Sequence, residues 1–281
     1  MNKKKEFTKE EIAAFIPDEK VGLVATVNSE GLPHITLITS LQALDETHMS
    51  FGEFSHGLSK SHVQKNPHVG FLIMTLDKSM WRGTALWTHR RMEGPEYEIY
   101  NEKPMFRYNT YFGINTVHYM DLVETTQKEP LPLAKIILAS LVTKAVKSGA
   151  AMKHPAPVLK PLAQNIFSML DSLKFVAYID NNGFPVIIPV IQCQAADSRG
   201  LVFSTIAYGD ELAAIPAHTE IALYALTMKM ENVLARGNFS GLKRVRGFTL
   251  GSVDISWVYN SMPPAHGQIY PELPLEAVLD F

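Results

Sequence analysis

The chain has 281 residues, of which 46% are hydrophobic and 19% charged, so it can bury a sizeable core and has room for two domains. Its 26 Lys and Arg residues against 28 Asp and Glu give a formal net charge of −2, which offers no support for a nucleic-acid partner. The single cysteine, Cys193, excludes an intramolecular disulfide and a thiolate metal cluster.

The N-terminal sequence MNKKKEFTKEE lacks the apolar segment of a secretory signal. The longest apolar segment, residues 131–146, contains Lys135 and Lys144 and is too short to span a bilayer. We therefore expect a cytoplasmic protein with no membrane partner. The ten histidines show no H-E-x-x-H motif and no compact ligand spacing, so we also expect no metal site.

The first part of the chain has a strand pattern that follows one short helix. Capping-box spacing from Thr8 to Glu11 predicts a helix that ends near Pro17. Alternating apolar and β-branched residues then predict strands separated by turn residues. These strands are expected at residues 21–39 (a hairpin that turns at 28–31), 49–53, 69–75, 81–88 and 114–126, with a short helix at 59–64.

Residues 95–112 are rich in tyrosine and phenylalanine and interrupt this strand pattern. The insertion has two open interpretations. It could cap the end of a barrel, or it could wall a pocket beside a planar cofactor, because aromatic faces stack well on flat rings.

Residues 131–173 have a helical pattern, opened by Pro130 and Pro132 and divided by Gly149. We interpret them as a packed helical linker, since apolar stripes on helices usually face a core. A helix that binds a membrane or a partner is the alternative.

The strand pattern then repeats. The G-x-P turn at Gly31 and Pro33 recurs 152 positions later at Gly183 and Pro185. At the same offset Phe203 matches Phe51, Gly209 matches Gly57 and Ile221 matches Val69, and a two-residue insertion pairs Arg236-Gly237 with Arg82-Gly83. We therefore expect two copies of one β-rich unit. The expected domains are a first barrel at 1–128, a helical linker at 129–160 and a second barrel at 161–281.

Ser59, Lys60 and Ser61 follow the third strand of the first copy directly. An ammonium group supplies charge for a phosphate, and hydroxyl groups with free backbone N–H groups supply directional donors. This cluster is our candidate phosphate site.

The first copy resembles the FMN-binding split-barrel family related to pyridoxamine 5′-phosphate oxidase. The matching motifs are an alanine strand with a G-x-P hairpin, a Ser-Lys loop and helix after a strand, an Asn-Pro before the next strand, and a Gly-Thr-Ala strand. In this sequence the matching residues are Ala25, Gly31, Pro33, Ser55, Ser59, Lys60, Asn66, Pro67, Val69, Gly83, Thr84 and Ala85.

The resemblance implies mainly β structure, with two tandem antiparallel split β-barrels that form an internal pseudo-dimer and could be monomeric. It implies that the flavin FMN lies in the groove between the barrels, with its phosphate on Ser59 and Lys60 beside Ser55 and His56. The second strand would line the flavin ring through Thr36, Ile38, Thr39 and Ser40.

The family implies a flavin-dependent oxidoreductase that acts on a small molecule. Many members carry an arginine on the second strand, and this sequence has none there. It also lacks a match to the C-terminal substrate signature of the true oxidases. The resemblance therefore does not imply vitamin B6 oxidation. The alternatives are a split barrel that binds F420 or haem, a non-catalytic flavin-binding module, and a structural pseudo-dimer without a ligand.

In the second copy Glu211 and Leu212 replace Ser59 and Lys60, with Asp210 before them. Because carboxylates repel a phosphate, we expect one FMN per chain.

Overall fold

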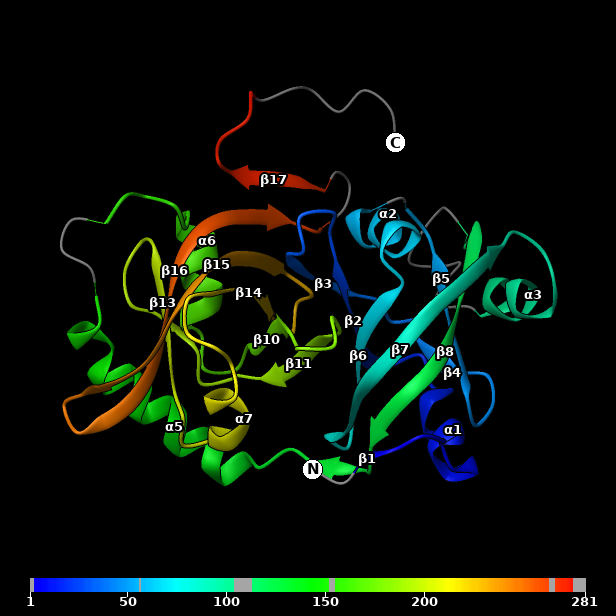
Figure 1. Ribbon diagram of the computed structural model, residues 1–281, viewed down its shortest axis with the longest axis horizontal. Helices are drawn as coiled ribbons and strands as arrows, with labels where there is room; N and C mark the ends of the chain where they lie inside the picture. The colour runs from blue at the N-terminus through cyan, green and yellow to red at the C-terminus, as the bar shows by residue number, and fades with distance from the viewer. Residues whose placement is uncertain (1–2, 56, 104–112, 152–154, 263–265, 275–281) are drawn as a thin grey trace. The chain divides into compact units, whose positions relative to one another are not determined.

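The computed structural model of the chain describes residues 3–55, 57–103, 113–151, 155–262 and 266–274. The protein is mainly β and contains two antiparallel sheets, as predicted (Figure 1). By packing it divides into two units, the first of which comprises Met1–Leu131 together with Ile179–Ile187. The second comprises Pro132–Tyr178 and Ile188–Phe281. The first unit is therefore discontinuous in sequence.

The first sheet has the strand order β3-β2-β6-β7-β8-β5-β4, with β1 paired to β8 and β9 paired to β7. Its strands are β1 (Lys3–Lys4), β2 (Lys20–Val27), β3 (Pro33–Leu37), β4 (Gln42–Ala43), β5 (His48–Glu53), β6 (His68–Thr75), β7 (Ser79–Arg91), β8 (Thr116–Thr126) and β9 (Glu129–Pro130).

The described residues of this unit contain three helices: α1 (Lys9–Phe15), α2 (Leu58–Lys65) and α3 (Pro95–Glu102). The capping box that the sequence predicts for α1 is present, because Thr8 and Glu11 exchange side-chain and backbone hydrogen bonds. The main core of the unit lies under α1 and α2 and is apolar. Its members include Phe7, Phe15, Val24, Phe51, Val63, Phe71 and Trp81.

The helix α3 forms the described part of the aromatic insertion, for which the sequence left two interpretations open, a barrel cap and a pocket wall. Tyr100 is fully buried, and its hydroxyl group lies 2.7 Å from Ser50 Oγ on β5. With Tyr97, Ile114, Val117 and Tyr119 it forms a small second core. The described part of the insertion therefore covers the β5–β8 part of the sheet, while Tyr108 and Tyr111 lie outside the described residues.

The second sheet has the strand order β11-β10-β14-β15-β16-β13-β12, with β17 paired to β16. Its strands are β10 (Leu173–Ile179), β11 (Pro185–Pro189), β12 (Gln194–Ala195), β13 (Gly200–Ser204), β14 (Thr219–Leu226), β15 (Asn232–Val245), β16 (Phe248–Asn260) and β17 (Gly267–Tyr270). The helices after Leu131 are α5 (Leu133–Val146), η1 (Lys147–Gly149), α6 (Pro161–Ser168) and α7 (Gly209–Ala213).

The two sheets follow the same path from strand to strand, as two copies of one unit would. The hairpin turns are alike in detail. Gly31 and Gly183 both have positive φ, at 76° and 82°, which glycine adopts without steric cost. Asn28 in one turn and Asp180 in the other each accept two backbone hydrogen bonds through the side chain.

The strand register corrects one detail of the predicted repeat. Val69 lies opposite Ala85, and Ile221 lies opposite Gly237. The offset of 152 therefore continues through this strand pair, and Gly237 takes the place of Ala85 rather than that of Gly83. The two-residue insertion expected before Arg236-Gly237 is wrong, because Arg-Gly occurs at two different points of similar strands.

Among the described residues, no helix combines the length and the apolar character that crossing a membrane requires.

Candidate functional site

The helix α2 places the two predicted phosphate ligands on its inner face. Ser59, Lys60 and Val63 are all buried, because residues three and four positions apart lie on the same side of a helix. Val63 packs in the main core and His62 reaches Thr26 on β2, with 3.0 Å between Thr26 Oγ1 and His62 Nδ1. These contacts fix α2 against the sheet.

Lys60 is only 8% exposed, which is unusual for a lysine. Among the described residues its ammonium group makes no hydrogen bond and no ion pair. Burial lowers the pKa of Lys60, and the carboxylate of Glu53 opposes this shift. The site therefore holds a cationic group whose hydrogen-bonding capacity is unused.

Ser59 has the same character. Its side chain is 1% exposed, and Oγ has no hydrogen-bond partner. The N-cap of α2 is Gly57, which provides no side-chain cap for the first N–H groups of the helix. Buried polar atoms normally have partners, and the N-terminus of a helix favours negative charge. A hydroxyl, an ammonium and an uncapped helix start together suit an anion.

The carboxylate of Glu53 belongs to a buried chain of polar groups. Its Oε2 lies 2.7 Å from His118 Nε2, and Trp87 Nε1 donates to His118 Nδ1 over 3.1 Å. Because an indole nitrogen can only donate, Nδ1 carries the lone pair and Nε2–H donates to Glu53. The Phe51 ring stacks on the imidazole at 4.7 Å between ring centroids. Glu53 thus accepts a buried hydrogen bond from His118, and it also acts electrostatically on Lys60.

The sequence prediction did not include Glu53, His118 or Trp87. The available signal was strand alternation, since Met49, Phe51 and Glu53 occupy one face of β5 and a carboxylate continues a row of core positions. His118 lies directly opposite Phe51 on β8, a pairing that requires knowledge of the strand register.

The residues predicted to line the flavin ring lie in and after β3. Thr36 and Thr39 are half-buried, and among the described residues their hydroxyl groups make no hydrogen bond. Ile38 packs in the main core. Ser40 is buried and exchanges two hydrogen bonds with the backbone of Gly52, so its hydroxyl fastens this segment to β5. Of the remaining predicted ligands, Ser55 is exposed and His56 lies outside the described residues.

At matching places the second unit has no comparable polar group. By strand register and by sequence offset, Thr205 replaces Glu53, Gly251 replaces His118, Phe239 replaces Trp87 and Leu212 replaces Lys60. Leu212 is fully buried, and the Phe203 and Phe239 rings stack over the space above Gly251. Asp210 and Glu211 lie in the first turn of α7. The interior of this unit is apolar where that of the first unit is charged.

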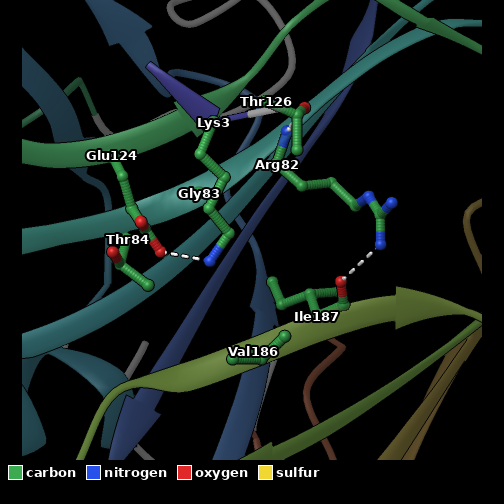
Figure 2. A pocket seen from close by; sticks show the side chains of 8 residues that line it. All are labelled: Lys3, Arg82, Gly83, Thr84, Glu124, Thr126, Val186 and Ile187. Atoms are coloured by element: carbon green, nitrogen blue, oxygen red, sulfur yellow. Dashed lines mark hydrogen bonds and ion pairs between the residues drawn. The ribbon is translucent and has the colours of Figure 1, made fainter. Parts of the chain in front are cut away.

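A small pocket lies elsewhere in the first unit (Figure 2). Arg82 donates to the carbonyl oxygen of Ile187 over 3.3 Å and pairs with Glu129, while Lys3 pairs with Glu124. The pocket has a volume of about 30 Å³, which is room for a water molecule and far too little for a flavin ring. Among the described residues, no group of three or more His, Cys, Asp or Glu side chains could hold a metal ion.

Residues 8–109 match the protein family described as pyridoxamine 5′-phosphate oxidase. The predicted family resemblance is confirmed. The match covers α1 to α3 and includes the helix that carries Ser59 and Lys60, so the candidate phosphate site lies inside the family domain. A comparison with curated proteins found no match.

Several solved structures are similar to part of the chain. An FMN-binding protein from Syntrophomonas wolfei is 14% identical, with a TM-score of 0.38, and the similarity covers 44% of this chain and 86% of that one. HupZ of Group A Streptococcus is 19% identical, with a TM-score of 0.34, over 41% of this chain and 89% of that one. A protein named F420 reductase is 13% identical, with a TM-score of 0.34, over 43% and 98%. With TM-scores below 0.5, these similarities carry no weight for function.

Proposed function

We propose that the first unit binds FMN, with the phosphate on Lys60 and Ser59, and that the protein is an oxidoreductase acting on a small molecule. The observation that carries the proposal is the pair of buried polar groups on α2, an ammonium without an ion-pair partner and a hydroxyl without a hydrogen bond. A buried cation that nothing neutralises directly is costly unless a ligand completes its environment. The family of the domain makes a flavin phosphate the best candidate for that ligand.

Each group has a distinct role in this proposal. Lys60 supplies the charge, Ser59 and the first N–H groups of α2 supply directional donors, and Thr36 and Thr39 offer free hydroxyl groups near the ring. The carboxylate of Glu53 opposes the effect of burial on the pKa of Lys60, because a nearby negative charge favours the ammonium form. FMN would supply the redox chemistry, while the protein binds and orients it.

Comparing FMN with riboflavin tests the assignment, because riboflavin lacks the phosphate. Replacing Lys60 by Ala should weaken FMN binding by about ten- to a hundredfold, the value of a charge-assisted contact. Riboflavin binding should hardly change. Lys65→Ala is the matched control, since Lys65 lies on the same helix and is exposed.

The measurement is fluorescence titration of the ligand-free protein with each flavin. Equal loss of FMN and riboflavin affinity in Lys60→Ala would place Lys60 away from the phosphate. A visible spectrum of the purified protein tests the cofactor itself, because flavin bands and a haem Soret band differ. Electron transfer from the bound flavin to an added acceptor would distinguish an enzyme from a binding module.

A further inference from the structure

The helix α5, labelled in Figure 1, buries one set of side chains against its own unit and exposes large apolar side chains on the opposite face. The face that packs on its own unit carries Ser140 and Thr143 among small and apolar residues. Thr143 Oγ1 accepts a hydrogen bond from the backbone N–H of Ser204 on β13, and Ser204 Oγ donates to the carbonyl oxygen of Ala139. These bonds fix the orientation of the helix, so the opposite face points outward.

The outward face carries more large apolar side chains than the buried one. It exposes four large side chains, which are Leu133 at 43%, Ile137 at 60%, Leu138 at 54% and Leu141 at 55% exposure. At about 100° per residue these four span about 140° of the helix circumference. An exposed apolar patch of this kind on a folded protein usually marks an interaction surface. The helix α5 therefore packs on its own unit through one face only, and its other face is exposed.

The charges beside the patch indicate what covers it. At about 100° per residue, Lys135 lies about 60° beyond Leu138, while Lys144 lies within the exposed arc, near its C-terminal end, and both lysines are exposed. From Pro130 to Leu170 the sequence contains five lysines and no acidic residue. A second copy of the chain would bring the same lysines against them, since α5 has no carboxylate to offer, and like charges repel. An anionic lipid surface supplies both an apolar layer and negative charge.

We propose that the outward face of α5 lies on anionic membrane surfaces, with its leucine and isoleucine side chains among the acyl chains and Lys135 and Lys144 at the headgroups. A helix with an apolar arc binds in this way, parallel to the bilayer plane, when its lysines can extend their long side chains to the headgroups. This mode needs no membrane-spanning helix, and it does not depend on the flavin assignment.

Cosedimentation of the full chain with vesicles tests the proposal. The protein should bind vesicles of equal parts phosphatidylglycerol and phosphatidylcholine, and should bind pure phosphatidylcholine much more weakly. Added salt should reduce the binding, because it screens the lysines. Ile137→Glu should lower partitioning at least tenfold, and Lys144→Ala about fivefold.

Leu76→Glu is the matched control, because Leu76 is 78% exposed in the turn between β6 and β7. This variant should bind vesicles like the unmodified protein. Thermal melts should show both glutamate variants folded, since each replaces an exposed side chain. Equal binding to neutral vesicles, or equal loss in Leu76→Glu, would overturn the proposal. So would a dimer that Ile137→Glu dissociates without any vesicle binding, because the face would then join two copies of the chain.

Discussion

A lysine buried without a direct partner lowers the stability of the protein that contains it. At Lys60 the folded state disfavours the ammonium form, which is why burial lowers the pKa. Between this lowered pKa and the ordinary pKa of lysine, the unfolded chain holds a proton that the folded chain has released. The contribution of Lys60 to stability therefore rises with pH across that interval and is least favourable below it. A residue kept under such a cost is a candidate for a binding role.

This cost predicts opposite effects of one substitution on stability and on binding. Lys60→Met should stabilise the ligand-free protein at neutral pH by about 1–3 kcal/mol, because methionine fills a similar volume without a charge. The gain should shrink at alkaline pH, where the lysine of the original protein is already neutral in the folded state. The same variant should bind FMN more weakly.

Urea unfolding of the ligand-free protein, followed by tryptophan fluorescence, measures the effect. Lys65→Met serves as the control and should change stability little at any pH, since Lys65 is exposed. A loss of stability in Lys60→Met would show that the ammonium group is stabilised within the folded protein by contacts that replace water.

At the scale of elements, β5 and β8 enclose a buried polar pair that β13 and β16 lack. Glu53 and His118 are hydrogen-bonded in the first unit, whereas Thr205 and Gly251 occupy these places in the second. Phe51 stacks on the imidazole in one unit, and Phe203 stacks on Phe239 in the other. The same strand path thus accommodates either a charged or an apolar interior.

The pairing of Glu53 with His118 predicts a coupled loss of stability. His118→Leu should destabilise the first unit by about 1–3 kcal/mol, because it removes the donor of a buried hydrogen bond to the Glu53 carboxylate. Adding Glu53→Leu to this variant should restore part of the loss, so the double variant should cost less than the sum of the single ones.

A double-mutant cycle from urea unfolding gives the interaction energy. The control is His89→Leu, because His89 on β7 is exposed and its ring stack on Tyr119 should contribute no more than about 1 kcal/mol. Additive effects of the two single substitutions would show that the 2.7 Å contact contributes nothing to stability.

At the scale of the whole molecule, the difference between the units predicts the stoichiometry. The helix α2 of the first unit carries Lys60 on its inner face. The corresponding helix α7 of the second unit carries Leu212 there, with Asp210 and Glu211 beside it. Since two carboxylates repel a phosphate, one FMN should bind per chain. Calorimetric titration of the ligand-free protein should give a ratio of one, and Lys60→Ala should weaken that binding. A ratio of two would show that the acidic first turn of α7 does not exclude the ligand.

Much of this architecture could be predicted from local sequence patterns. Alternation and turn residues identified the strands, the Gly31 and Gly183 turns revealed the similarity of the two halves, and α2 was expected at 59–64 against the observed Leu58–Lys65. These features depend on residues close together in the chain. The burial of Ser59 and Lys60 was not predicted, although the helix that carries them was, and their roles toward FMN stay predictions.

Other features depend on residues far apart in sequence. The contact between Glu53 and His118 joins two strands separated by the aromatic insertion, so it becomes visible only with the strand register. The outward apolar face of α5 could not be predicted, because an apolar stripe does not reveal which side of a helix meets the core. Hydrogen bonds from Ser204 settle that question in the structure.

The discontinuity of the first unit has a consequence for the order of events during synthesis. Ile179–Ile187 packs with residues that the ribosome makes much earlier. In this packing a side chain at Gly70 would meet the carbonyl oxygen of Pro185 at 2.0 Å, so the two backbones lie close together. At about 5–20 residues per second, the nascent first unit waits several seconds for its last segment, which emerges after α5, α6 and β10. The packing of the first unit is therefore completed only after part of the second unit has been synthesised.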